Sequence, residues 1–343
     1  MNGRKKALAP PAPLVAHRPI RLDGLVNPYG PCLAAIDAVS GGAPERALEP
    51  QSDRLRQRIG ESLGVPTRWV LLGSRADDLL AAFALWQSRR GPTALFRPGD
   101  ERPRELTQRL GGEPIVISRA ASFALELEPE LLSSLPPNAA AIVGSPSDPT
   151  GAALGISDAV RLLRACDVLL VDERHMGYCA RSLAPALREF GNLLILQTFE
   201  TWAGLSAFPL ACLVGAPRFL GQIAALLPSG PTASGVAAAL ATLDDRSCMT
   251  AATRRVREER SRLYRMLRKL SIVQPFPSLA NFMLARVELG TAEQVLTGLQ
   301  ERGIWVHRPA DPELRDCLRI SAGLSTETDA LRAALIEITL EIV

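Results

Sequence analysis

The sequence predicts an α/β protein in which a mostly parallel central sheet is flanked by helices. The chain has 343 residues, 47% of them hydrophobic and only 5% aromatic, which is typical of strands and helices that share one interior. Residues 93–117 follow a strand–helix–strand pattern, and such a crossover joins parallel strands. The run CDVLLVDE, residues 166–173, contains four consecutive apolar residues, VLLV, and ends in two acids, as expected of a central parallel strand.

Charge and hydropathy exclude several classes of protein. The net charge is +3 and the arginines are interspersed with acids, so no nucleic-acid partner is expected. No apolar run reaches the roughly 18 residues of a membrane span. The start of the chain is basic, but prolines break its apolar part, which favours a flexible or partner-contacting arm over a signal peptide. We therefore expect a cytoplasmic protein.

The cysteines and lysines limit the chemistry. Six cysteines are scattered without a Cys-x-x-Cys pair, so we expect buried, reduced thiols and no metal. The only lysines are Lys5, Lys6 and Lys269. This scarcity matters because imine chemistry needs an amine with a reachable neutral form.

The first half of the chain alternates helices and strands. The turn NPYGP, residues 27–31, precedes a short helix, and residues 51–64 form an amphipathic helix. Residues 68–74 then form a strand that leads through a glycine into a helix over 76–90. A helix that begins after such a turn presents free N–H groups to an anion, and Arg75 is a candidate anion contact at this turn.

The segment LLILQTFETWAGLSAFPLACLVG, residues 193–215, forms two buried strands joined by a turn. It resembles the cofactor-lysine segment of the class I/II, fold-type I pyridoxal-phosphate aminotransferases of the histidinol-phosphate type. Their turn reads Ser-Lys-x-x-Gly-Leu-x-x-x-Arg. The glycine and leucine are present here, but Glu200 stands for the serine, Thr201 for the lysine and Pro209 for the arginine.

Other positions match the same family. Asn27 and Tyr29 lie in the NPYGP turn, which in the family borders the substrate pocket. Asp172 matches the aspartate that pairs with the pyridinium nitrogen, and His175 stands where the family has a tyrosine. Arg319 matches the arginine that binds a substrate carboxylate.

Several family features are absent. The phosphate-binding turn Gly-x-Gly-Ser reads Gly-Ser-Arg-Ala at residues 73–76, which removes a glycine and a hydroxyl. Asp100 lies where the family's stacking aromatic would be. Asp148 replaces an asparagine that donates to the cofactor, and an ionised carboxylate cannot donate. Ala47 replaces a tyrosine that a neighbouring subunit usually contributes.

The resemblance covers roughly residues 20–343 and implies the domain organisation. We expect an N-terminal arm (1–20), a small-domain segment (21–44), a large domain (45–249) and a small α+β C-terminal domain (250–343). The last begins with a long polar helix over 250–268 and continues with strands and helices in the family's order. Because family members build their site from two subunits, a homodimer is expected.

The missing groups suggest a degenerate homologue that does not perform lysine-based transamination. Asp100, Asp148, Asp172 and Glu200 would surround the old cofactor cavity, with Thr201 at its floor, and would favour an amine or guanidine over a phosphate. We therefore expect no cofactor, and cofactor-independent binding or conversion of an amino-acid-like or amine ligand in a biosynthetic pathway. Any ligand carboxylate would bind the matched arginine at position 319.

Three alternatives stay open at this point. Asp172 and His175 could form an acid–base pair, or act only as a buried carboxylate and a space-filling imidazole. The chain could be a non-catalytic scaffold or partner subunit, which side chains such as Trp202 and Phe208 filling the cavity would favour. It could also be an aminotransferase that holds pyridoxal or pyridoxamine phosphate non-covalently. Whether the protein is an enzyme is therefore left open.

Overall fold

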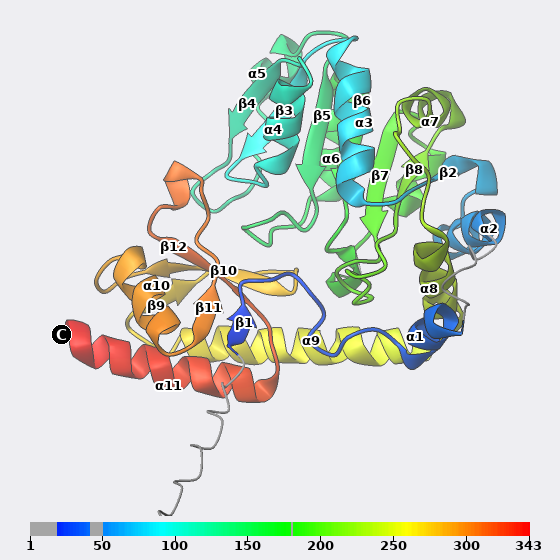
Figure 1. The fold of residues 1–343 in the computed structure, drawn as a ribbon. Helices are drawn as coiled ribbons and strands as arrows, with labels where there is room; N and C mark the ends of the chain where they lie inside the picture. The colour runs from blue at the N-terminus through cyan, green and yellow to red at the C-terminus, as the bar shows by residue number, and fades with distance from the viewer. Residues whose placement is uncertain (1–18, 42–50, 180) are drawn as a thin grey trace, which may run out of the picture.

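A seven-stranded sheet forms the larger part of the molecule (Figure 1). The computed structural model describes residues 19–41, 51–179 and 181–343. The strand order is β2-β8-β7-β6-β5-β3-β4, and every neighbouring pair is parallel except those that β8 makes with β2 and β7. The predicted α/β class with a mostly parallel sheet is confirmed. The bounds of the strands are β2 Val70–Gly73, β3 Thr93–Arg97, β4 Pro114–Ser118, β5 Ala140–Gly144, β6 Val168–Asp172, β7 Leu193–Thr198 and β8 Ala211–Gly215.

Strand β6 shows why this sheet is buried on both faces. Every one of its residues is buried. Leu169 and Val171 belong to the core on one face, while Val168 and Leu170 belong to the core on the other, because successive side chains of a strand point to opposite faces. An unbroken apolar run is therefore the pattern that this position requires.

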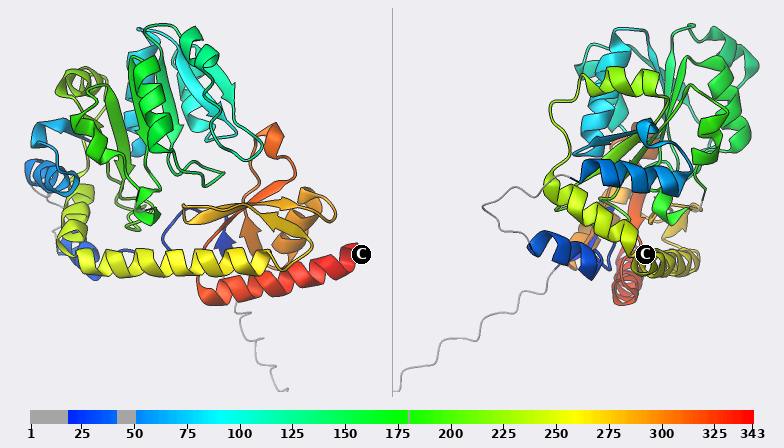
Figure 2. Two further views of the ribbon diagram at one scale, coloured as in Figure 1. Left: turned by 180° about the vertical axis from the view of Figure 1, so that it is seen from behind. Right: turned by 90° about the vertical axis from the view of Figure 1, so that its right-hand side faces the viewer.

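Helices cover both faces of the sheet (Figures 1 and 2). Residues of α3, α4 and α7 pack in one core, and residues of α1, α2, α6 and α8 pack in the other. The bounds are α1 Leu33–Ser40, α2 Ser52–Leu63, α3 Ala76–Ser88, α4 Arg102–Arg109, α5 Pro129–Ser134, α6 Ile156–Ala165, α7 Pro217–Ala224 and α8 Ala233–Asp244. Short 3-10 turns are η1 Thr67–Trp69, η2 Met176–Tyr178, η3 Ala184–Arg188 and η4 Pro312–Leu314.

A smaller α+β part follows the sheet. Helix α9 runs as a long rod from α8 to a three-stranded antiparallel sheet of order β12-β10-β9, and α11 lies beside it (Figure 1). The N-terminal strand β1 pairs in parallel with β11, so the start of the chain returns to the C-terminal part. The bounds are β1 Ile20–Leu22, α9 Arg246–Leu267, β9 Val273–Pro275, β10 Phe282–Val287, α10 Ala292–Glu301, β11 Ile304–Val306, β12 Cys317–Ser321 and α11 Ser325–Ile342.

Some sequence predictions change in detail. Helix α9 begins at Arg246 rather than at residue 250, because the Asp245 side chain caps it by accepting from the Cys248 N–H. Ala47 and most of the N-terminal arm lie outside the described residues, and the division of the chain into four parts stays a prediction. Within the described ranges, no helix has the length and apolar character needed to cross a membrane.

Candidate active site

The candidate site lies where the parallel strands end. Asp100 follows β3, Asp148 follows β5, Asp172 ends β6, and Glu200 and Thr201 follow β7. Parallel strands end at the same edge of a sheet, and such edges are where α/β proteins place ligands. The structure therefore brings together the acids that the sequence placed around one cavity.

Arg174, which was not among the predicted site residues, forms an ion pair with Asp172. Its Nε donates to Asp172 Oδ1 at 2.9 Å and to Oδ2 at 2.7 Å. Its Nη2 also pairs with Asp100, and its Nη1 lies 3.6 Å from an oxygen of Asp77. Three carboxylates therefore hold one guanidinium. The sequence could have predicted this pairing, because Arg174 follows directly after the two acids at the end of β6 and is the cation nearest to them in the chain.

The charges of this cluster shift the pKa of its members. Burial disfavours the charged form of Arg174, but attraction to Asp172 and Asp100 outweighs it and raises the pKa of this guanidinium. For Asp100, burial raises the pKa of the carboxyl against the opposing pull of Arg174. The side chain of Arg174 is 19% exposed and that of Asp172 only 7%, so solvent screens this pair weakly.

Arg319 and Asp148 form a second buried ion pair. Arg319 Nη1 donates to both oxygens of Asp148, at 2.7 and 2.6 Å, and Nη2 donates to the carbonyl of Asp23 at 2.8 Å. The guanidinium also lies 5.4 Å from the centre of the Phe282 ring. The arginine expected to bind a substrate carboxylate is therefore already bound to a carboxylate of its own chain.

His175 lies in the same region but does not contact Asp172 as a partner. Its ring packs edge-on against Phe282 with the centroids 5.3 Å apart, and its buried Nδ1 has no hydrogen-bond partner among the described residues. Burial lowers the pKa of His175 to about 4, so the imidazole is neutral at pH 7. The acid–base pair suggested by the sequence does not form here, because both Asp172 oxygens are bound to Arg174.

Asn27 holds the turn that carries Thr201. The Asn27 Nδ2 donates to the carbonyl of Trp202 at 3.0 Å, and its backbone N–H donates to the carbonyl of Thr201 at 3.2 Å. Its Oδ1 accepts from the N–H of Tyr29 at 3.0 Å. Thr201 Oγ1 donates to the carbonyl of Arg174 at 2.7 Å. Its hydroxyl therefore links the β7 turn to the segment after β6.

Glu200 and Arg75 meet at the turn between β2 and α3. Arg75 Nη2 lies 3.2 Å from Glu200 Oε2, with the Arg75 side chain 56% exposed and that of Glu200 17% exposed. Arg75 and Glu200, which both replace family residues near the expected phosphate site, therefore carry opposite charges and form an ion pair. Glu200 does not present an uncompensated negative charge to this turn.

The free space at the site is small. A cavity of about 30 Å³ lies beside Asp100, Asp172 and Gly144, which has room for little more than water. Trp202 and Phe208 are not among the residues that line this cavity. Trp202 instead borders a separate pocket of about 300 Å³ between the sheet and helices α2, α8 and α9. That larger pocket is lined by none of the site acids.

Comparisons with known proteins assign the family. Residues 119–335 match the sequence profile described as Aminotransferase class I and II. The chain belongs to this family. Over 340 residues it is 30% identical to the histidinol-phosphate aminotransferase of Roseiflexus castenholzii, covering 95% of this chain and 91% of the relative.

Solved structures of aminotransferases share the fold. The histidinol-phosphate aminotransferase of Clostridium acetobutylicum aligns with a TM-score of 0.85 at 16% identity, covering 94% of this chain and 99% of that one. The enzyme from Sinorhizobium meliloti, solved in complex with pyridoxal-5'-phosphate, aligns with a TM-score of 0.83 at 21% identity, covering 94% and 91%. The fold-type I aminotransferase assignment is therefore confirmed.

These comparisons overturn two expectations. The prediction of a degenerate, cofactor-independent protein is wrong, because the relatives of this aminotransferase-family chain are named histidinol-phosphate aminotransferases. The prediction that no cofactor is used is wrong for the same reason and because of the pyridoxal-phosphate complex. The physical error was to treat these acids as negative charges without a cationic partner. Arg174, Arg319 and Arg75 each neutralise acids that were expected to repel a phosphate.

The residues present do not fit a covalently attached cofactor. Thr201, at the position that resembles the family's lysine, offers a hydroxyl rather than an amine. The Arg174 guanidinium is bound to Asp172, the carboxylate that the resemblance implies would pair with a pyridinium nitrogen.

Proposed function

We propose that this chain is an aminotransferase-family protein that binds pyridoxal or pyridoxamine phosphate non-covalently. The observation that carries the proposal is the Asp172–Arg174 pair. A buried carboxylate at the end of the central strand binds a planar, delocalised cation through N–H donors. A pyridinium N–H presents the same chemistry, so the cofactor ring would take the place of the guanidinium. When bound, the cofactor would supply the amino-group carrier that transamination needs.

The chain's own residues would position the ligands. Asp172 would hold the ring nitrogen, and Arg75 would offer a cation near the turn at the start of α3 once Glu200 turns away. Asn27 would keep the Thr201 turn in place. Arg319 is held by Asp148, so a ligand carboxylate would have to compete with that residue.

The substrate class follows from the same charges. An anion at Arg319 would have to displace Asp148, whereas an amine or alcohol group would not. We therefore propose an amine-bearing small molecule as the substrate, and histidinol phosphate is the first to test because the relatives are named for it. The homodimer and the cytoplasmic location remain predictions of the sequence.

Amino-group transfer is the direct test. Purified protein with added pyridoxal phosphate is incubated with histidinol phosphate or other amines and a 2-oxo acid, and the new amino acid is quantified by mass spectrometry. We expect transfer that requires added cofactor and falls at least tenfold in Asp172→Asn. No transfer above that of free cofactor, with any amine of the set, would refute the proposal.

A further inference from the structure

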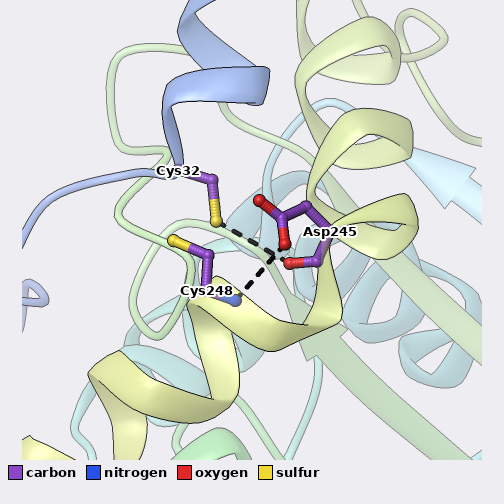
Figure 3. A group of neighbouring side chains, drawn as sticks. All are labelled: Cys32, Asp245 and Cys248. Carbon is purple, nitrogen blue, oxygen red and sulfur yellow. Dashed lines mark hydrogen bonds between the residues drawn. The ribbon is translucent and has the colours of Figure 1, made fainter.

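Two cysteines and an aspartate meet at the junction between α1 and α9, away from the site described above. Cys32 precedes the first residue of α1, Asp245 caps α9, and Cys248 lies in the first turn of α9. Their ligand atoms all lie within 4.8 Å of one another. Figure 3 shows the two sulfurs side by side between the helices, with the Asp245 side chain next to them.

The surrounding contacts hold the three groups in place. Asp245 Oδ1 accepts from the Cys248 N–H at 3.4 Å and from the Ser247 hydroxyl at 2.8 Å. The Cys32 thiol lies 3.9 Å from the backbone carbonyl of Asp245. Cys32 is 1% exposed, whereas Cys248 and Asp245 are partly exposed. The cluster is therefore closed on the Cys32 side and accessible from the α9 side.

We propose that Cys32, Cys248 and Asp245 form a binding site for a divalent cation of the zinc class. Two sulfur ligands select a borderline or soft metal over magnesium or calcium, which prefer oxygen ligands. With Zn–S distances of about 2.3 Å and Zn–O distances of about 2.0–2.2 Å, a tetrahedral ion requires the three ligand atoms to approach by only a small movement. Water from the exposed side would complete the coordination.

The electrostatics of the cluster suit a cation. Burial, the hydrogen bond with Cys248 and the charge of Asp245 together raise the pKa of the Cys32 thiol to about 12. A cation between the sulfurs would reverse this effect, since a coordinating thiol loses its proton. The Asp245 carboxylate would add a third negative charge, so two thiolates and one carboxylate around a dication would leave the occupied site with a net charge of about −1.

The metal would join two segments that are far apart in the sequence. Cys32 and Asp245 are separated by 213 positions, so no local cysteine spacing could show the site. Cys32 follows directly after the NPYGP turn, and the ring of Tyr29 in that turn lies 5.6 Å from the guanidinium carbon of Arg255 on α9. A metal would therefore fix the turn that borders the candidate active site to the helix that leads into the small α+β part.

Cobalt binding tests the proposal. Reduced, chelator-treated full-length protein is titrated with Co²⁺, and thiolate-to-cobalt charge-transfer and tetrahedral d–d absorption are recorded. We expect one equivalent to bind and zinc to displace it. Both bands should be lost in Cys32→Ala and in Cys248→Ala, and retained in Cys166→Ala as the matched control.

Asp245→Asn separates metal binding from folding, because asparagine caps helices as well as aspartate does. We expect this variant to fold normally by circular dichroism and to bind Co²⁺ at least tenfold more weakly. The proposal is overturned if the folded wild type gives no charge-transfer band, or if the band survives both cysteine variants. It is also overturned if the reduced pair binds no metal and instead forms a Cys32–Cys248 disulfide when glutathione disulfide is added.

Discussion

Asp172 holds the Arg174 guanidinium with both of its carboxylate oxygens, at 2.9 and 2.7 Å from Nε. The pair lies at the end of the central strand, where the family resemblance implies contact with a cofactor ring. In the proposed binding mode Arg174 is the side chain that the cofactor ring displaces, and its removal gives the first prediction.

Arg174→Ala should bind pyridoxal phosphate at least tenfold more tightly than the wild type, a gain of about 1.4 kcal/mol. The ring would no longer compete with an internal cation for Asp172. The affinity is measured by equilibrium dialysis. Arg90→Ala serves as the control, because Arg90 pairs with Asp167 outside the site and its loss should leave the affinity unchanged.

The same variant should unfold more easily. Asp172, Asp100 and Asp77 would lose their shared cation, and breaking a buried pair typically costs about 3–5 kcal/mol. Urea denaturation without cofactor measures this loss. Unchanged cofactor affinity in a folded Arg174→Ala protein would show that the guanidinium does not occupy the ring site.

Asp148→Asn should release Arg319 for a ligand. In the wild type, Asp148 occupies the arginine with two short contacts, whereas a neutral amide binds a guanidinium more weakly. We expect a tenfold or larger gain in affinity for carboxylate ligands such as glutamate, measured by calorimetry. The double variant Asp148→Asn/Arg319→Lys should lose most of this gain, and equal glutamate binding by wild type and Asp148→Asn would count against the assignment.

His175 should make stability depend on pH. Burial lowers its pKa to about 4 from the ordinary 6.5, so between these values the unfolded chain binds a proton that the folded protein does not. Above about pH 6.5 the histidine does not reduce the free energy of unfolding. As the pH falls toward 4, protonation of the unfolded chain lowers this free energy, by about 2 kcal/mol at pH 5.

Urea denaturation at pH 7.5 and pH 5 tests this difference. His175→Gln should show a smaller loss between the two pH values, because the other titrating groups, including Asp100, are common to both proteins. His307→Gln measures the separate share of His307, because burial also lowers the pKa of that imidazole. Identical pH dependence in wild type and His175→Gln would contradict the buried, neutral imidazole.

Asn27→Ala should weaken the Thr201 turn. The side chain is 4% exposed, donates to the Trp202 carbonyl and accepts from the Tyr29 N–H. Leaving these groups unsatisfied should cost about 2–3 kcal/mol, measured by urea denaturation. Arg21→Ala, which removes an exposed pair with Asp23, should shift the urea midpoint far less.

The fold could be predicted from the sequence because its signals are local. The apolar run of β6 directly indicates a strand that is buried on both faces. The strand–helix–strand pattern of residues 93–117 directly indicates how two parallel strands are connected. The start of α9 was predicted four residues too late. It depends on which side chain accepts a hydrogen bond from the first free N–H groups, and here that side chain is Asp245.

The candidate site was predicted only in part. The acids were identified because they stand at positions where the family resemblance implies the cofactor cavity, and the structure places them at strand ends that share one edge of the sheet. Their partners were not, because the choice of Arg174 for Asp172, or of Asp148 for Arg319, depends on side-chain directions that no periodicity encodes. The meeting of Cys32 with Cys248 likewise depends on the packing of α1 beside the start of α9.

Non-covalent cofactor binding is tested most directly on the intact protein. The protein is loaded with pyridoxal phosphate, dialysed to measure bound cofactor, reduced with borohydride and weighed by mass spectrometry. We predict saturable binding near one equivalent that weakens in Asp172→Asn, with no cofactor fixed to the chain at that stoichiometry. Stoichiometric attachment to Lys5, Lys6 or Lys269, located by peptide mapping, or the absence of any saturable binding would contradict it.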